Sequence, residues 1–167
     1  MIDVELRAAA KRLLALLRAR GLKVVTAESC TGGLVAATLT EIAGSSDVVD
    51  CGFVTYSNTA KQTLLGVPAA TLERHGAVSA PTAAAMAAGA LRSSPADLSV
   101  AITGVAGPGG GTKHKPVGLV YFAAASRGGR LIERSRRFGK IGRRRVRERS
   151  VAEAFDLLEL LAAASPA

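Results

Sequence analysis

The spacing of apolar and polar positions changes several times along the 167-residue chain, and each change predicts a new helix or strand. Leucines at helical spacing predict an amphipathic helix over residues 3–20, which Gly21 ends. The β-branched run at residues 22–27 predicts a buried strand. A turn at residues 28–31 and a second helix over residues 32–43 follow. The chain therefore opens with a helix–strand–helix unit.

The same pattern continues through the rest of the chain. Alternating helices and strands are typical of α/β folds with parallel strands, and a hairpin adds an antiparallel part. We expect one α/β domain over residues 1–167, an α/β sandwich with a partly parallel sheet. The further predicted elements are a strand at 51–56, a helix at 58–65 with Asn58 as N-cap, a helical turn at 70–74, a helix from Ser79 to 92, a strand at 98–103, a glycine-rich loop at 104–116, a hairpin of 117–125 with 131–138, and a helix at 143–163.

Composition limits the class of protein. Hydrophobic residues make up 49% of the chain and aromatic residues only 4%, so small aliphatic side chains must fill the core. No apolar run reaches the roughly 20 residues that a membrane-spanning helix needs, and charges interrupt the N-terminal apolar pattern, unlike in a signal peptide. We expect a soluble, cytoplasmic protein. Cys30 and Cys51 make no disulfide framework, and His75 lies far from His114, so we expect no metal site.

The net charge of +9 attracts phosphate, nucleic acid or acidic membrane. It is concentrated between Arg127 and Arg149, where ten arginines and one lysine face two glutamates. This arginine run fits a nucleic-acid surface or a monophosphate clamp, and it equally fits a solvated basic helix face. Aromatic residues do not alternate with the arginines, so single-stranded nucleic acid is poorly supported as a partner.

The segment V-V-T-A-E-S-C-T-G-G places Ser29 in a turn between a strand and a helix. Such turns lie at the carboxyl edge of an open α/β sheet, where ligands bind, and they expose the free N–H groups of the helix. Gly32 and Gly33 permit close approach of backbone to ligand. Ser29 therefore suits a nucleophile whose oxyanion the following amides hold. The alternative is that Ser29 or Thr31 only caps the helix.

A serine nucleophile needs a base, and neither histidine is well placed for a serine–histidine–aspartate triad. Lys61 lies in the first turn of the helix that starts near Asn58, where the helix dipole and partial burial lower a lysine pKa. A neutral amine there accepts the Ser29 proton, with Tyr56 relaying it or orienting the amine. The alternative is a solvated surface lysine. Cys30 competes as nucleophile, but a small cysteine at a helix start more often packs in the core.

A glycine-rich run, T-G-V-A-G-P-G-G-G-T at residues 103–112, follows the strand predicted at 98–103. It matches neither the Walker A loop nor the G-x-G-x-x-G fingerprint. Its N–H groups still suit a phosphate or a carboxamide, and the alternative is a mobile loop. Thr103 shares the sheet edge with Ser29 if the two strands are parallel.

Five segments together resemble one known family in order and spacing. They are T-A-E-S-C-T-G-G at 26–33, G-F-V-T-Y-S-N-x-A-K at 52–61, H-G-A-V-S at 75–79, T-G-V-A-G-P-G-G-G-T at 103–112 and K-P-V-G-L-V-Y at 115–121. The chain resembles the C-terminal domain family of the competence/damage-inducible protein CinA, and above all its stand-alone nicotinamide-nucleotide amidohydrolases. The resemblance implies a three-layer α/β/α sandwich with a mixed, mostly parallel sheet, usually in a homo-oligomer.

The resemblance also implies a reaction without a cofactor. The carboxamide of nicotinamide mononucleotide is hydrolysed to nicotinate mononucleotide and ammonia, and the product re-enters NAD synthesis. Ser29 matches the family's nucleophile and Lys61 its base, while Tyr56 assists. The residues expected to bind substrate are Thr31, Gly32, Gly33, Thr103, Gly104, Gly107, Arg144 and Arg147.

One departure from the family concerns the start of the last helix. The family has Gly-Asp-Arg there, and in this chain Arg143 stands in place of the acidic residue. The departure and the arginine run leave a second hypothesis, a nucleotide- or nucleic-acid-binding module of the CinA type without catalysis. An amidase for another pyridine or purine nucleotide is a third.

Overall fold

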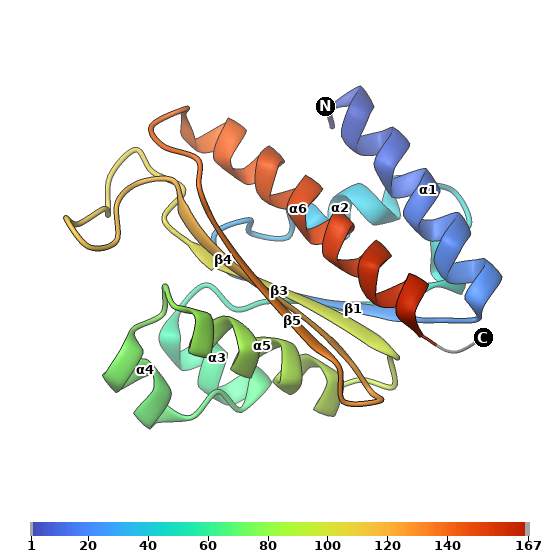
Figure 1. The fold of residues 1–167 in the computed structure, drawn as a ribbon, viewed down its shortest axis with the longest axis horizontal. Helices are drawn as coiled ribbons and strands as arrows, with labels where there is room; N and C mark the ends of the chain where they lie inside the picture. The colour runs from blue at the N-terminus through green and yellow to red at the C-terminus, as the bar shows by residue number, and fades with distance from the viewer. Residues whose placement is uncertain (1, 166–167) are drawn as a thin grey trace.

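A computed structural model describes residues 2–165 as one five-stranded sheet between two layers of helices (Figure 1). The strands are β1 (Val24–Glu28), β2 (Val49–Val54), β3 (Leu98–Gly104), β4 (Leu119–Ser126) and β5 (Leu131–Arg137). The helices are α1 (Val4–Arg20), α2 (Leu34–Thr40), α3 (Asn58–Leu65), α4 (Ala69–His75), α5 (Ala80–Arg92) and α6 (Arg143–Ala164), with a 3-10 turn, η1 (Ser45–Asp47), before β2.

The sheet has the order β2-β1-β3-β4-β5. β1 pairs in parallel with both β2 and β3, whereas β4 is antiparallel to β3 and to β5. The predicted mixed α/β sheet is therefore confirmed, and β4 alone runs against the other four strands. Glu28 is in register with Val54 on one side and Ile102 on the other, so the three parallel strands end together at one edge. The residues after these ends are brought side by side.

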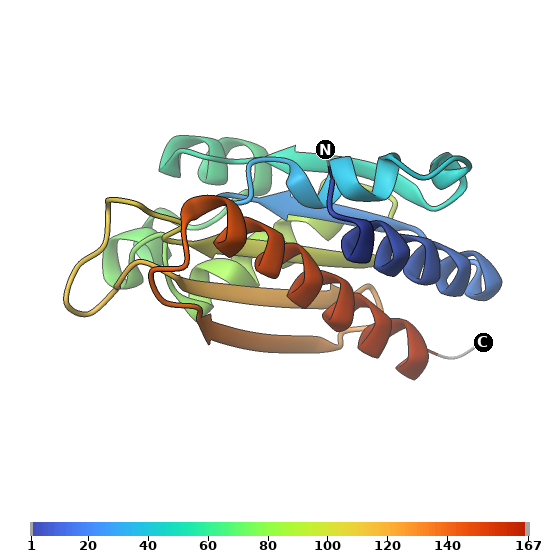
Figure 2. The same ribbon diagram turned by 90° about the horizontal axis from the view of Figure 1, so that it is seen from above.

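Helices cover both faces of the sheet (Figures 1 and 2). α1, α2 and α6 pack on one face around a core that includes Leu13, Phe122 and Phe155. α3, α4 and α5 cover the other face, where the core includes Met86 and many alanines. The scarcity of aromatic residues is thus met by close packing of small side chains. No helix within residues 2–165 is long and apolar enough to cross a membrane.

Several predicted boundaries move at glycines and caps. Helix α2 starts at Leu34 and not at residue 32, because Gly32 and Gly33 have left-handed backbone conformations with φ of 58° and 91°. It ends at Thr40, well before residue 43. The predicted N-cap Asn58 is also wrong, because the Ser57 hydroxyl accepts the Ala60 N–H at 3.0 Å and Asn58 is the first helical residue. The strand predicted at 51–56 is β2 (Val49–Val54).

Substitution of Gly89 by alanine should destabilise the fold without touching any catalytic group. A Cβ at Gly89 would lie 2.0 Å from the Leu65 carbonyl oxygen, so α5 and α3 must separate. Overpacking of this kind costs about 1–3 kcal/mol or more, and we expect a lower Tm in thermal unfolding. Gly128→Ala is the matched control, because its nearest neighbour would be 3.8 Å away. Equal Tm values for the two variants would contradict this account of the α3–α5 contact.

Candidate active site

The ends of the three parallel strands open into a cavity of about 290 Å³. Ser29 follows β1, Lys61 lies on the helix after β2, and Thr103 lies at the end of β3. The predicted residues Ser29, Tyr56, Lys61, Thr103, Gly104 and Gly107 all line this cavity, together with Cys30 and Arg143. The structure does not bring the other predicted binding residues to its wall, namely Thr31, Gly32, Gly33, Arg144 and Arg147.

The Lys61 side chain is buried, with 1% of its surface exposed. Its Nζ lies 3.0 Å from the Ser29 Oγ, 2.8 Å from the Thr55 carbonyl oxygen and 3.4 Å from that of Tyr56. The alternative of a solvated surface lysine is therefore wrong. Removal from water disfavours the ammonium form, and this burial lowers the pKa of Lys61 below its usual 10.5.

The three oxygen atoms around the Lys61 amine differ in what they can do. The Thr55 and Tyr56 carbonyls only accept hydrogen bonds, so each takes an N–H. A neutral amine has two N–H groups and one lone pair, and the lone pair then faces the Ser29 hydroxyl, which donates. A neutral Lys61 amine in this arrangement can accept the Ser29 proton.

The Glu28 side chain extends from the end of β1 and caps the start of α2. The sequence analysis gave this residue no role. Its carboxylate is fully buried and accepts the N–H groups of Gly33, Val35 and Ala36 at 3.0, 3.0 and 2.9 Å. The alternative in which Ser29 or Thr31 caps this helix is therefore wrong. The expectation that these helical N–H groups face a ligand is also wrong, because an internal anion already holds them. A cap that comes from the preceding strand, five to eight residues upstream, has no local sequence signature.

The other N–H groups of the turn differ in whether they have a hydrogen-bond partner. The Ser29 N–H donates to the Ile102 carbonyl at 2.9 Å, and the Gly32 N–H donates to the Ser29 carbonyl at 3.0 Å. Within residues 2–165, the N–H groups of Cys30 and Thr31 have no hydrogen-bond partner. The sequence suggested that all N–H groups of the turn could bind an oxyanion at Ser29. In the described part of the chain, the structure leaves only these two N–H groups of the turn without a partner.

Cys30 lines the cavity but is a poor nucleophile. Only 6% of the residue is exposed, and burial raises the pKa of its thiol to about 12. At neutral pH the thiol is protonated and unreactive. The structure therefore does not favour Cys30 as a nucleophile.

Among the described residues, Arg143 is the only arginine that lines the cavity. It is the first residue of α6, and its guanidinium donates to the Gly107 carbonyl at 2.7 Å and to the Tyr56 hydroxyl at 2.9 Å. The Tyr56 hydroxyl is thus paired with Arg143, whereas its carbonyl holds Lys61. The sequence analysis expected Arg144 to bind the substrate. In the structure Arg144 is exposed and pairs with Glu148 at 2.7 Å.

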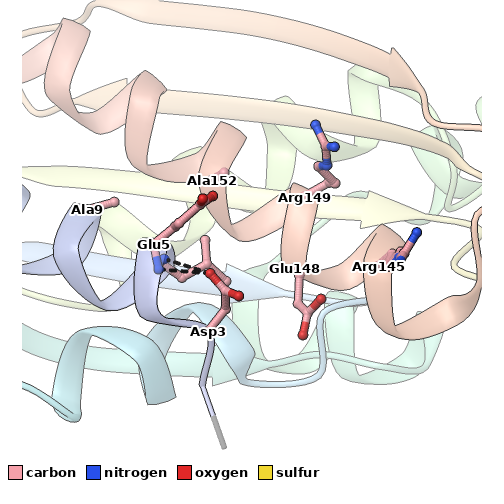
Figure 3. A pocket seen from close by; sticks show the side chains of 8 residues that line it. Asp3, Glu5, Ala9, Arg145, Glu148, Arg149 and Ala152 are labelled. Carbon is pink, nitrogen blue, oxygen red and sulfur yellow. Dashed lines mark hydrogen bonds between the residues drawn. The ribbon is translucent and has the colours of Figure 1, made fainter.

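The arginine run does not gather into one surface. Seven of its ten arginines donate hydrogen bonds within the chain, to carbonyls, to Glu148 or Glu153, or to Tyr56. Two others, Arg145 and Arg149, line a second cavity of about 450 Å³ between α1 and α6 (Figure 3). Asp3 there accepts the N–H groups that begin α1. No serine, cysteine, lysine or histidine lines this second cavity, so it offers no nucleophile with a base.

The fold and the site together define an α/β sandwich protein with a serine–lysine pair at the carboxyl edge of its parallel strands. The chain belongs to the CinA C-terminal domain family, whose model matches residues 6–162. Within residues 2–165 no group of three histidine, cysteine, aspartate or glutamate side chains is arranged to hold a metal ion.

Relatives of two lengths match the chain. It is 49% identical over 158 residues to the nicotinamide-nucleotide amidohydrolase PncC of Escherichia coli K12, and the match covers 95% of each chain. It is 57% identical to a CinA-like protein of Mycolicibacterium vanbaalenii over 83% of this chain, but it spans only 32% of that longer relative. A crystal structure of the competence/damage inducible protein CihA from Agrobacterium tumefaciens superposes with a TM-score of 0.95 at 50% identity, covering 96% of this chain and 98% of that one.

The buried amine predicts a specific dependence of stability on pH. Between the lowered pKa of folded Lys61 and 10.5, the unfolded chain binds a proton that the folded chain does not, so the Lys61 contribution to stability rises with pH. Lys61→Met removes this dependence. We expect the methionine variant to be the more stable protein near neutral pH, by a margin that shrinks toward pH 10.5.

Denaturant unfolding across this pH range measures the margin. Lys140→Met is the matched control, because Lys140 is exposed and should show no such trend. A pH-independent difference between wild type and Lys61→Met would show that the amine is not desolvated in the folded protein.

Proposed function

We propose that this chain is an amidohydrolase that releases ammonia from the carboxamide of nicotinamide mononucleotide and leaves nicotinate mononucleotide for NAD recycling. The observation that carries the proposal is the 3.0 Å contact between the buried Lys61 amine and the Ser29 hydroxyl. Such a pair is a nucleophile with its own base. The name of the E. coli relative, which matches along nearly the whole chain, supports a nicotinamide nucleotide as the substrate.

The reaction begins with proton transfer from the Ser29 hydroxyl to the neutral Lys61 amine. The serine oxygen attacks the carboxamide carbon, and the carbonyl oxygen becomes an oxyanion beside the N–H group of Cys30, which is unpaired and belongs to a residue of the cavity wall. The Thr103 hydroxyl already donates to the Ala77 carbonyl at 2.7 Å, so its oxygen is left to accept from the substrate amide nitrogen. The nitrogen that will leave is thereby oriented.

Collapse of the tetrahedral intermediate breaks the carbon–nitrogen bond. The Lys61 ammonium gives its proton to the departing nitrogen, ammonia leaves, and Ser29 carries an ester. The neutral Lys61 then takes a proton from water, which attacks the ester and regenerates the serine. Amide and water are converted to carboxylic acid and ammonia, with no metal or redox step.

Arg143 is the group proposed to hold the substrate phosphate. Its guanidinium contacts Gly107 and Tyr56 at the cavity wall, and it is the arginine of the run that the fold directs there. A planar guanidinium forms paired hydrogen bonds with phosphate oxygens. The neighbouring N–H groups of the loop after β3, which also lines the cavity at Gly107, Gly109 and Gly110, supply further donors.

Removal of either member of the serine–lysine pair should abolish ammonia release. A nucleophile and its base act as a unit, so Ser29→Ala and Lys61→Met should each lose about three or more orders of magnitude in kcat. Cys30→Ala is the matched control in the same turn and should keep most of the activity. The measurement is ammonia release from nicotinamide mononucleotide, with folding checked by circular dichroism.

Two results would redirect the assignment. Full activity of Ser29→Ala would remove the serine as nucleophile, and a folded but inactive Cys30→Ala would move that role to the thiol. If folded wild type releases no ammonia from this or another pyridine nucleotide, salt-sensitive binding to DNA becomes the next measurement, since it tests the binding-module hypothesis. Homo-oligomer formation and a cytoplasmic location stay predictions.

Loss of the Arg143 guanidinium should weaken substrate binding more than it slows the reaction. A charged hydrogen-bonding group contributes about 1.5–3 kcal/mol, so Arg143→Gln should raise KM for the mononucleotide about 10- to 100-fold while kcat changes little. Arg144→Gln is the control, because its side chain lies on Glu148 outside the cavity. An unchanged KM in Arg143→Gln would show that the phosphate binds elsewhere.

A further inference from the structure

The turn after Ser29 is held by two opposite charges that come from different parts of the fold. The Glu28 carboxylate reaches it from β1 and accepts the Gly33 N–H, together with two N–H groups of α2. The Arg147 guanidinium reaches it from α6 and donates through two nitrogens to the Thr31 carbonyl, at 2.7 and 3.2 Å. One anion therefore fixes N–H groups of the turn, and one cation fixes a carbonyl.

These contacts leave some backbone N–H groups of the turn without a hydrogen-bond partner. The Ser29 N–H and carbonyl are bonded to Ile102 and Gly32. The Thr31 carbonyl is taken by Arg147, and the Gly33 N–H by Glu28. Of the N–H groups of residues 29–33, those of Cys30 and Thr31 have no hydrogen-bond partner in the part of the chain that the structure describes, and the buried Thr31 Oγ1 has none either. The amide after a serine nucleophile is the usual oxyanion donor in hydrolases with a strand–turn–helix serine.

Helix capping alone does not account for a buried carboxylate here. Other helices of the chain are capped by short side chains, such as those of Asp3 before α1, Ser57 before α3 and the buried Ser79 before α5. Glu28 is 0% exposed, and a fully buried charge is unfavourable unless all its hydrogen bonds are met. It serves a helix of only seven residues. The free-energy cost of burying the Glu28 carboxylate is explained if the reaction depends on the geometry of the turn.

We propose that Glu28 and Arg147 are positioning residues, which together hold the turn at residues 29–33 so that the Cys30 N–H group remains available to the oxyanion formed at Ser29. This inference rests on the amidohydrolase function proposed above. It also reassigns Arg147, which the sequence suggested as a substrate ligand, because its guanidinium lies on the Thr31 carbonyl and not on the cavity wall.

The test compares Glu28→Gln, Arg147→Gln and the double variant in ammonia release from nicotinamide mononucleotide. Loss of an oxyanion donor lowers kcat about 100- to 1000-fold, and a displaced turn should cost a part of that, about 10- to 100-fold, with KM within about threefold of wild type. Because both side chains hold one turn, the double variant should lose less than the product of the two single losses.

Arg127→Gln is the matched control. Arg127 also donates its guanidinium to backbone carbonyls, those of Leu91, Ser94 and Ala96, but at the far end of α5. Its variant should lose stability and keep kcat and KM. Amide hydrogen exchange supplies a readout that does not need turnover: exchange across residues 30–36 should accelerate in the two turn variants and stay unchanged in Arg127→Gln.

The outcomes separate this inference from the proposed function. A raised KM with normal kcat in Arg147→Gln would make Arg147 a substrate ligand and overturn the positioning role. If Glu28→Gln does not fold, Arg147→Gln decides alone, since Arg147 is half-buried on α6 and its unchanged kinetics and exchange would also overturn the inference. A wild type that releases no ammonia overturns the proposed function and the inference with it.

Discussion

The burial of the Lys61 amine is the constraint from which the rest of the site follows. An amine with 1% exposure must find acceptors inside the protein, and the chain provides the Thr55 and Tyr56 carbonyls where β2 leads into α3. Those carbonyls use both N–H groups of a neutral amine, so the remaining lone pair has one direction left, toward Ser29. Burial thus lowers the pKa of Lys61 and also fixes the position of its amine beside Ser29.

The Glu28 carboxylate is a buried charge next to Ser29 in the chain. Because Glu28 holds the first N–H groups of α2, the helix start that normally attracts a substrate anion is neutralised from within the protein. In the proposed function the substrate phosphate is therefore held by Arg143, the described arginine of the cavity wall, and not by the start of α2. The proposal thus assigns the reacting carbonyl and the phosphate to different parts of the cavity.

The sequence predicted the element order, the mixed sheet and the meeting of Ser29, Lys61 and Thr103, because parallel strands fix which residues share an edge. It could not predict Glu28 as a cap, since that contact joins a strand to a later helix and follows no local pattern. It also could not choose among the arginines. Arg143 and Arg144 are adjacent on α6 and face different directions, toward the cavity and Glu148. Arg147 lies one turn after Arg143 and reaches the Thr31 carbonyl, not the cavity wall.

The glycine-rich loop shows how one sequence pattern can have two physical causes. Its glycines suggested backbone N–H groups open to a phosphate, yet Cβ atoms at Gly104 and Gly107 would lie 2.6 Å from the Leu119 carbonyl and the Val117 side chain. Glycine is required there because the loop packs directly on the chain entering β4. The same packing holds the loop against the cavity wall, so the position of the loop follows from core packing.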